Sequence, residues 1–74
     1  MNKYLATAAT FDGVSAQATF TSIETAKSWA RRHVTDNISV VISDAGFPSR
    51  YIKLDKLRGK NFWNGTAPTS WFSA

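Results

Sequence analysis

The stretch KYLATAATFDGVSAQATFT, residues 3–21, decides the fold because it has the pattern of a β-hairpin. Asp12 and Gly13 form a favoured two-residue turn, since both central positions of such a turn need a positive φ. A turn of this kind fixes the register of its two strands. Because nearly all the paired side chains are apolar and share one face, the turn and the period of two agree. The predicted pairs are Phe11 with Val14, Ala9 with Ala16, Thr7 with Ala18, and Leu5 with Phe20.

The opposite face of this hairpin carries no charge. Soluble sheets usually place Lys and Glu on an exposed face, so an uncharged one is expected to be covered. The cover would be either the C-terminal tail or another chain, and a homodimer through this face or through the tail is one form of the second alternative. The face would comprise Tyr4, Ala6, Ala8, Thr10, Ser15, Gln17, Thr19 and Thr21.

Residues 22–35 predict a helix. Thr21 and Glu24 have the spacing of a capping box, with Thr21 as the N-cap. The apolar residues then recur at helical spacing and form one stripe. That stripe comprises Ile23, Ala26, Trp29, Ala30 and Val34, and the opposite side carries Glu24, Lys27, Arg31 and Arg32.

Two further strands follow, at residues 38–43 and 50–55. Ile38, Val40 and Ile42 share one face of the first, and Ile52 and Leu54 point inward from the second. Residues 44–48 contain Gly and Pro and predict a turn, and residues 56–60 predict a loop. The uncharged, aromatic tail, residues 61–74, returns as an edge strand or lies over the sheet. The expected fold is a single small α+β domain of ββαββ order, an antiparallel sheet with one helix on one face.

Composition excludes several classes of protein. The 74 residues include no cysteine and one histidine, so neither a disulfide nor a thiolate metal site is possible. The five acids are scattered, which argues against a calcium or zinc site, and we expect no cofactor. No segment has the length and hydropathy of a membrane span. A chain without cysteine suits the reducing cytoplasm, which is the location we expect.

The sequence argues against an enzyme. His33 is the one histidine, and no nucleophile and base are matched to it. The four glycines are isolated, so no phosphate-binding loop is present. Asp55 alone makes no catalytic dyad. The other acids have local roles in turns and at helix ends: Asp12, Glu24, Asp36 and Asp44.

The main candidate site is a basic segment that runs into the aromatic tail. Residues 50–60 hold five of the nine basic residues, and no charge follows Lys60. Clustered cations attract phosphates or an acidic protein face, and exposed aromatics stack bases or anchor a protein partner. The plainer interpretations are a solvated edge strand and a tail that caps the core. The predicted partner-binding residues are Arg50, Tyr51, Lys53, Lys56, Arg58, Lys60, Trp63 and Trp71.

A second basic patch would lie on the helix, at Lys27, Arg31 and Arg32. Unpaired arginines can recognise a partner, but a charged outer face is also what an ordinary surface helix shows. Phe11, Phe20 and Trp29 occupy positions predicted to be in the core.

The sequence favours a non-enzymatic module that binds a protein or a ribonucleoprotein. The alternative is a nucleic-acid-binding protein that uses residues 50–60 and the neighbouring aromatics, which the net charge of +4 supports. No family motif is matched. In size and plan, one helix on a small sheet without cysteine, the chain is similar to several small phage proteins that inhibit host machinery. That resemblance implies an inhibitor and carries no residue with it.

Overall fold

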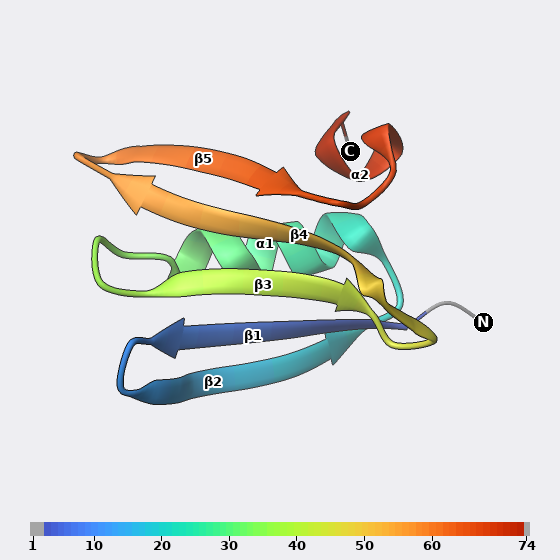
Figure 1. Cartoon of the computed structure of the whole chain (residues 1–74), viewed down its shortest axis with the longest axis horizontal. Helices are drawn as coiled ribbons and strands as arrows, with labels where there is room; N and C mark the ends of the chain where they lie inside the picture. Colours follow the sequence, from blue (N-terminus) through green and yellow to red (C-terminus); the bar gives the residue numbers. More distant parts are fainter. Residues whose placement is uncertain (1–2, 74) are drawn as a thin grey trace.

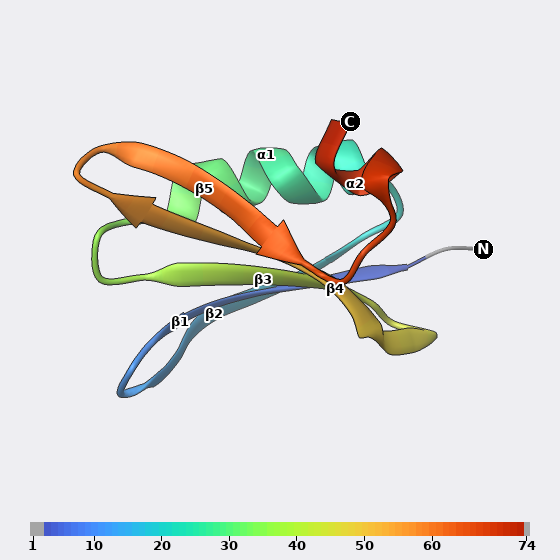
Figure 2. The same ribbon diagram turned by 45° about the horizontal axis from the view of Figure 1, so that its top comes forward.

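The computed structural model describes residues 3–73 and shows five antiparallel strands with two helices on the same side of the sheet (Figures 1 and 2). The order across the sheet is β2-β1-β3-β4-β5, so β2 and β5 are the edges. The expected α+β class and the helix on one face are confirmed, and the ββαββ order is extended by one strand and one helix. The elements are β1 (Tyr4–Thr10), β2 (Gly13–Phe20), α1 (Ile23–His33), β3 (Ser39–Asp44), β4 (Phe47–Leu57), β5 (Lys60–Gly65) and α2 (Thr69–Ser73).

The core lies between α1 and the sheet. Val40, Ile42, Ile52 and Leu54 are fully buried, which confirms the faces predicted for β3 and β4. Alanines on α1 and β1 meet across this layer, and their small side chains let the helix pack closely on the strand. The buried apolar residues are Ala6, Ala8, Ala26, Ala30, Val34, Val40, Ile42, Ile52, Leu54 and Trp71.

The hairpin β1–β2 forms, but the predicted register was wrong, because the turn lies one residue earlier than predicted. Thr10 pairs with Gly13, so the turn residues are Phe11 and Asp12. The register then shifts at a bulge, where Ser15 has no partner on β1. Beyond the bulge each β1 residue pairs one position away from its predicted partner, for example Ala8 with Ala16, so β1 places Tyr4, Ala6 and Ala8 on the helix side in place of Leu5, Thr7 and Ala9. Ala16, Ala18 and Phe20 of β2 face the helix side, as predicted, and the bulge turns Val14 to the other side.

Of the three aromatic residues predicted to lie in the core, two do so and one does not. Phe11 is 99% exposed at the tip of the turn, so its predicted core position was wrong. Phe20 and Trp29 do pack against the core, with ring centroids 6.1 Å apart. His33 stacks on Trp29 at 4.0 Å, and its Nδ1 lies 2.9 Å from the carbonyl oxygen of the same residue. The single histidine is therefore held by packing at the end of α1.

Helix α1 begins one residue later than the capping box predicts. Ser22 is the N-cap, and its Oγ accepts a hydrogen bond from the backbone N–H of Glu24 at 3.2 Å. The prediction of Thr21 as the cap was wrong because Ser22 has the extended backbone that a cap requires, with φ −133°. The three basic residues of the last turn lie where cations favour the helix dipole.

The last third of the chain is more ordered than predicted. The loop expected at residues 56–60 is a tight hairpin turn: β4 continues to Leu57, and Arg58 and Gly59 have φ of 53° and 80°. The expected turn at residues 44–48 is shorter, since β4 already begins at Phe47. The tail forms β5 at the sheet edge, then α2, which buries Trp71 on the helix side. Within residues 3–73 no helix is long and apolar enough to cross a membrane.

Candidate functional site

The face of the sheet away from α1 and α2, named here the open face, has no element over it within residues 3–73 (Figure 2). All five strands contribute alternate residues to it, so it extends across the full width of the sheet. The tail therefore does not cover the sheet on this side. By strand register the open face comprises Leu5, Thr7, Ala9, Val14, Gln17, Thr19, Ser39, Val41, Ser43, Tyr51, Lys53, Asp55, Leu57, Lys60, Phe62 and Asn64.

Large apolar side chains gather at the turn end of the open face. Among residues 3–73, five such side chains are exposed, and Val14, Leu57 and Phe62 lie on this face. Phe11 stands at its rim, in the β1–β2 turn. Leu57 and Phe62 are diagonal neighbours on β4 and β5, within reach of one another. Phe11 and Val14 at one hairpin turn, and Leu57 and Phe62 beside the other, are named here the apolar border of the open face, and β3 lies between the two pairs.

A shallow hollow of about 530 Å³ opens at the same end. Ala9, Ser39, Val41 and Lys53 form its floor on the sheet, and Phe11 lies at its edge. Its other lining residues are Thr10, Asp36 and Asn37, from the β1–β2 turn and the loop before β3. A hollow with both apolar and polar residues in its floor and an aromatic ring at its edge can receive a side chain of a docked protein.

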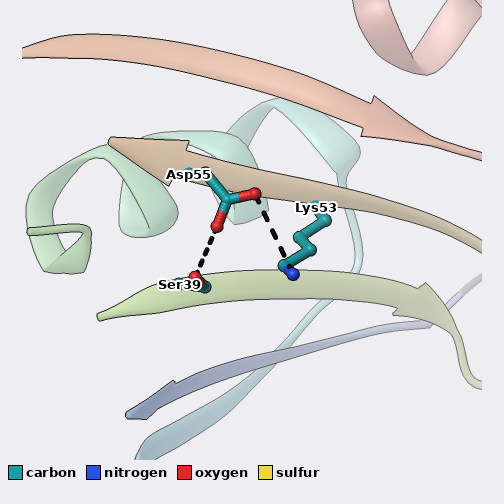
Figure 3. Close-up of polar contacts among 3 residues, drawn as sticks. All are labelled: Ser39, Lys53 and Asp55. Carbon is teal, nitrogen blue, oxygen red and sulfur yellow. Dashed lines mark hydrogen bonds and ion pairs between the residues drawn. The ribbon is translucent and has the colours of Figure 1, made fainter. Parts of the chain in front are cut away.

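One acid lies on the open face, and it is neutralised there. Ser39 Oγ donates a hydrogen bond to Asp55 Oδ1, and Lys53 Nζ lies 3.9 Å from Asp55 Oδ2 (Figure 3). The Lys53 and Asp55 side chains are 42% and 38% exposed, so the ion pair contributes at most about 1 kcal/mol to stability. Because these two charges are paired, the middle of the open face presents no net charge. Asp55, for which the sequence suggests no role, thus has a structural one.

The structure divides the predicted partner-binding residues. Tyr51, Lys53 and Lys60 lie on the open face, and Arg58 lies in the turn that borders it. Arg50 and Lys56 alternate with these residues and point to the helix side, where Arg50 lies 5.1 Å from the ring of Phe47. The basic segment therefore does not form one surface, because a regular strand sends its neighbours to opposite faces.

The two tryptophans of the predicted site face the helix. Trp71 is 6% exposed and meets the edge of the Tyr4 ring at 5.1 Å, so it belongs to the core. Trp63 is half-buried on β5 over α1, with Lys27 Nζ 5.0 Å and the Arg31 guanidinium 5.8 Å from its ring centre. Both therefore hold the tail against α1 and are absent from the open face.

The second basic patch was wrong in one of its three members. Lys27 is 1% exposed, and its Nζ donates hydrogen bonds to the carbonyl oxygens of Trp71 at 2.9 Å and Phe72 at 3.2 Å. These carbonyls belong to α2, whose last turn lacks intrahelical donors. Lys27 thus joins α2 to α1. Arg31 and Arg32 remain exposed.

Leu57, Val14 and Phe11 are candidate residues that sequence reasoning missed. Leu57 continues the alternation of Tyr51, Lys53 and Asp55, so the period of two would have assigned it had the strand been extended past Asp55. Val14 was assigned to the core face because the pattern does not predict the bulge at Ser15, and Phe11 was assigned to it because the turn lies one residue earlier than predicted.

Burial lowers the pKa of Lys27 below its ordinary value of 10.5, and the charge of Arg31 lowers it further. The unfolded chain therefore binds more protons between the two pKa values, and the free energy of unfolding contributed by Lys27 rises with pH across that interval. Met at this position cannot titrate. We expect the stability difference between wild type and Lys27→Met to move in favour of wild type from neutral pH to 10.5, by about 1.4 kcal/mol for each unit of pKa difference. Urea unfolding at several pH values measures it.

The matched control for this prediction is Lys60→Met, which removes an exposed lysine. The free energy of unfolding of this variant, measured over the same pH range, shows the effect of replacing a lysine that is exposed. A Lys27→Met profile parallel to that of Lys60→Met would contradict the burial of the Lys27 charge.

Comparison of the chain with protein-family models, with curated proteins and with solved structures finds no match. Residues 3–73 contain no group of three or more His, Asp or Glu side chains placed to hold a metal ion.

Proposed function

We propose that the protein is a non-enzymatic binding module that engages a protein partner through the open face. The observation that carries this proposal is a five-stranded sheet with one face uncovered across residues 3–73 and an apolar border at one end of it. A sheet face that no other element covers and that exposes large apolar side chains can meet another protein. A cytoplasmic location belongs to the same proposal, and inhibition of host machinery stays a prediction that the partner's identity would test.

The chemistry of the open face favours a protein over a phosphate backbone. Its single acid is paired with Lys53, and most of the residues that β1 and β3 contribute to this face are small or carry a hydroxyl group. Phe62 and Leu57 can be buried by an apolar partner surface, which contributes about 25 cal/mol for each Å² removed from water. The hollow beside Phe11 supplies a place for an anchoring side chain.

Phe62→Ala is expected to weaken partner binding by about ten- to thirty-fold, because a buried aromatic at an interface typically contributes about 2 kcal/mol. The immobilised protein is used to isolate its partner, which is identified by mass spectrometry and then titrated in purified form against each variant by calorimetry. Unchanged thermal unfolding shows that the variant is folded.

Phe47→Ala is the matched control. Phe47 is 54% exposed and Phe62 is 49% exposed, yet Phe47 pairs with Asp44 on the helix side of the sheet. The proposal requires that Phe62→Ala weakens binding and that Phe47→Ala does not. Equal affinities for the two variants would show that the partner binds elsewhere.

Nucleic-acid binding is the second candidate, supported by Tyr51 and Phe62 on the same face as Lys53 and Lys60. Aromatic rings beside cations can stack bases and hold a phosphate backbone. In that case single-stranded RNA or duplex DNA would bind with an affinity that falls steeply as salt increases. Replacing Arg58 and Lys60 by Gln would weaken this nucleic-acid binding at constant salt. An affinity that ignores salt would eliminate this candidate.

A further inference from the structure

The outer edge of β2 is a pairing surface that the fold leaves open. β2 pairs with β1 alone, so the backbone groups on its outer side have no strand partner within residues 3–73. Its eight residues, GVSAQATF, include no charge and no proline. Lysine and proline are the usual means by which an edge strand avoids adding another strand, and here only the bulge at Ser15 interrupts the edge. Residues 16–20 remain as a regular stretch beyond it.

A cationic groove lies against this stretch. It is a hollow of about 510 Å³, lined by Thr19 and Phe20 at the end of β2 and by residues of α1. Lys3 and Arg32 supply two positive charges, and no carboxylate lines the groove. Neither cation forms an ion pair within residues 3–73. The remaining lining residues are Thr21, Thr25 and Ser28, which carry hydroxyl groups.

We infer that the β2 edge binds an extended acidic peptide segment of a partner protein as a sixth strand. Its backbone pairs with residues 16–20, as in other cases of strand addition, and a carboxylate side chain enters the groove to meet Lys3 and Arg32. The hydroxyl of Ser28 can donate a further hydrogen bond to that carboxylate, whereas the hydroxyl of Thr25 already donates to the Ser22 carbonyl oxygen at 3.0 Å. This site lies at the β2 edge, at the opposite side of the sheet from Leu57 and Phe62, and assigns the protein a second, chemically defined partner segment.

Edge and groove together select this occupant over two others. A second copy pairing through its own β2 would bring no carboxylate to the groove, because residues 13–20 contain none, and each copy carries a net charge of +4. A nucleic acid offers phosphates to Lys3 and Arg32 but no peptide backbone to the strand edge. A peptide with acidic side chains satisfies both.

The test is an NMR titration of the wild-type protein with a synthetic eight-residue peptide of alternating Thr and Glu. We expect amide shifts at residues 16–20 and at Arg32, and an affinity about ten-fold weaker for Arg32→Gln or Lys3→Gln. Lys60→Gln, which removes an equal charge from the far edge strand, should change it less than two-fold. Phe62→Ala should leave the affinity for this peptide unchanged, and that result would show that the β2 edge binds independently of the residues in the open-face proposal.

Two further probes separate pairing from charge. The same peptide with alternate backbone amides methylated keeps every carboxylate but cannot complete a strand ladder, and it should bind at least ten-fold more weakly. The inference is overturned if the methylated peptide binds equally well, if an uncharged Thr and Gln peptide binds equally well, or if the shifts lie outside the β2 edge and the residues that line the groove. Dimerisation of the free protein through residues 16–20, seen by light scattering and by amide protection, would overturn it in favour of a second copy.

Discussion

Trp71→Ala is expected to destabilise the protein by about 3–5 kcal/mol, the usual loss for a buried tryptophan. The side chain is 6% exposed and packs against Tyr4 in the core, so its removal leaves a cavity at the end of the sheet. A domain of this size has a net stability on the order of 5 kcal/mol, so much of the population would unfold. Urea unfolding followed by far-UV circular dichroism measures the loss.

Phe62→Ala is the control for Trp71→Ala, because it removes an aromatic ring of the same tail that is half exposed on the other side of the sheet. We expect it to cost no more than about 1 kcal/mol. The two variants should therefore lose different properties: Trp71→Ala loses stability, and Phe62→Ala loses affinity for the partner. A Trp71→Ala protein as stable as wild type would show that α2 does not belong to the core.

The sequence predicts the elements of this fold better than it predicts their register. Ile52 and Leu54 alternate with polar residues, and Val40 and Ile42 alternate with Ser39, Val41 and Ser43, so their faces were assigned correctly. In β1 both faces consist of Ala and Thr with one larger residue each, Leu5 or Tyr4, so periodicity could not choose between them. On the buried face Tyr4 contacts Trp71, which comes from the far end of the chain. Such a long-range partner is invisible to a local pattern.

The candidate site was predicted only in part for the same reason. Tyr51, Lys53 and Lys60 are on the open face, but the sequence grouped all the cations of residues 50–60 by proximity along the chain, and the strand separates them. Lys27 occupies a helix position that solvated lysines also occupy. Its burial follows from α2, whose carbonyls it binds, and a helix of five residues gives too weak a pattern to be read in advance.

Gly65→Ala is expected to destabilise the protein by about 2–5 kcal/mol, from a strained backbone and from overpacking together. Gly65 has φ of 139°, and a Cβ there would lie 2.4 Å from the carbonyl oxygen of Tyr51 and 2.9 Å from Cα of Ile52. Both are backbone atoms of β4, a central strand, so they cannot rotate away as a side chain would. Thermal and urea unfolding of the variant measure the loss.

Gly59→Ala is the control that separates strain from close approach. Gly59 also has a positive φ, 80°, but a Cβ there would meet nothing within 4 Å. We expect a cost of about 1 kcal/mol from its backbone conformation alone. If Gly65→Ala costs no more than Gly59→Ala, the contact with β4 is not rigid.

The position of Gly65 makes a further result diagnostic. The chain leaves β5 at this residue, Ala67 N–H then donates to the Tyr51 carbonyl oxygen at 2.9 Å, and α2 follows with Trp71. If Gly65→Ala displaces the end of β5, it also moves Trp71 away from the core. Gly65→Ala and Trp71→Ala then remove much of the same packing. The double variant Gly65→Ala with Trp71→Ala should therefore cost at least 1 kcal/mol less than the sum of the single losses. Additive losses would mean that α2 packs on α1 independently of where the chain leaves the sheet.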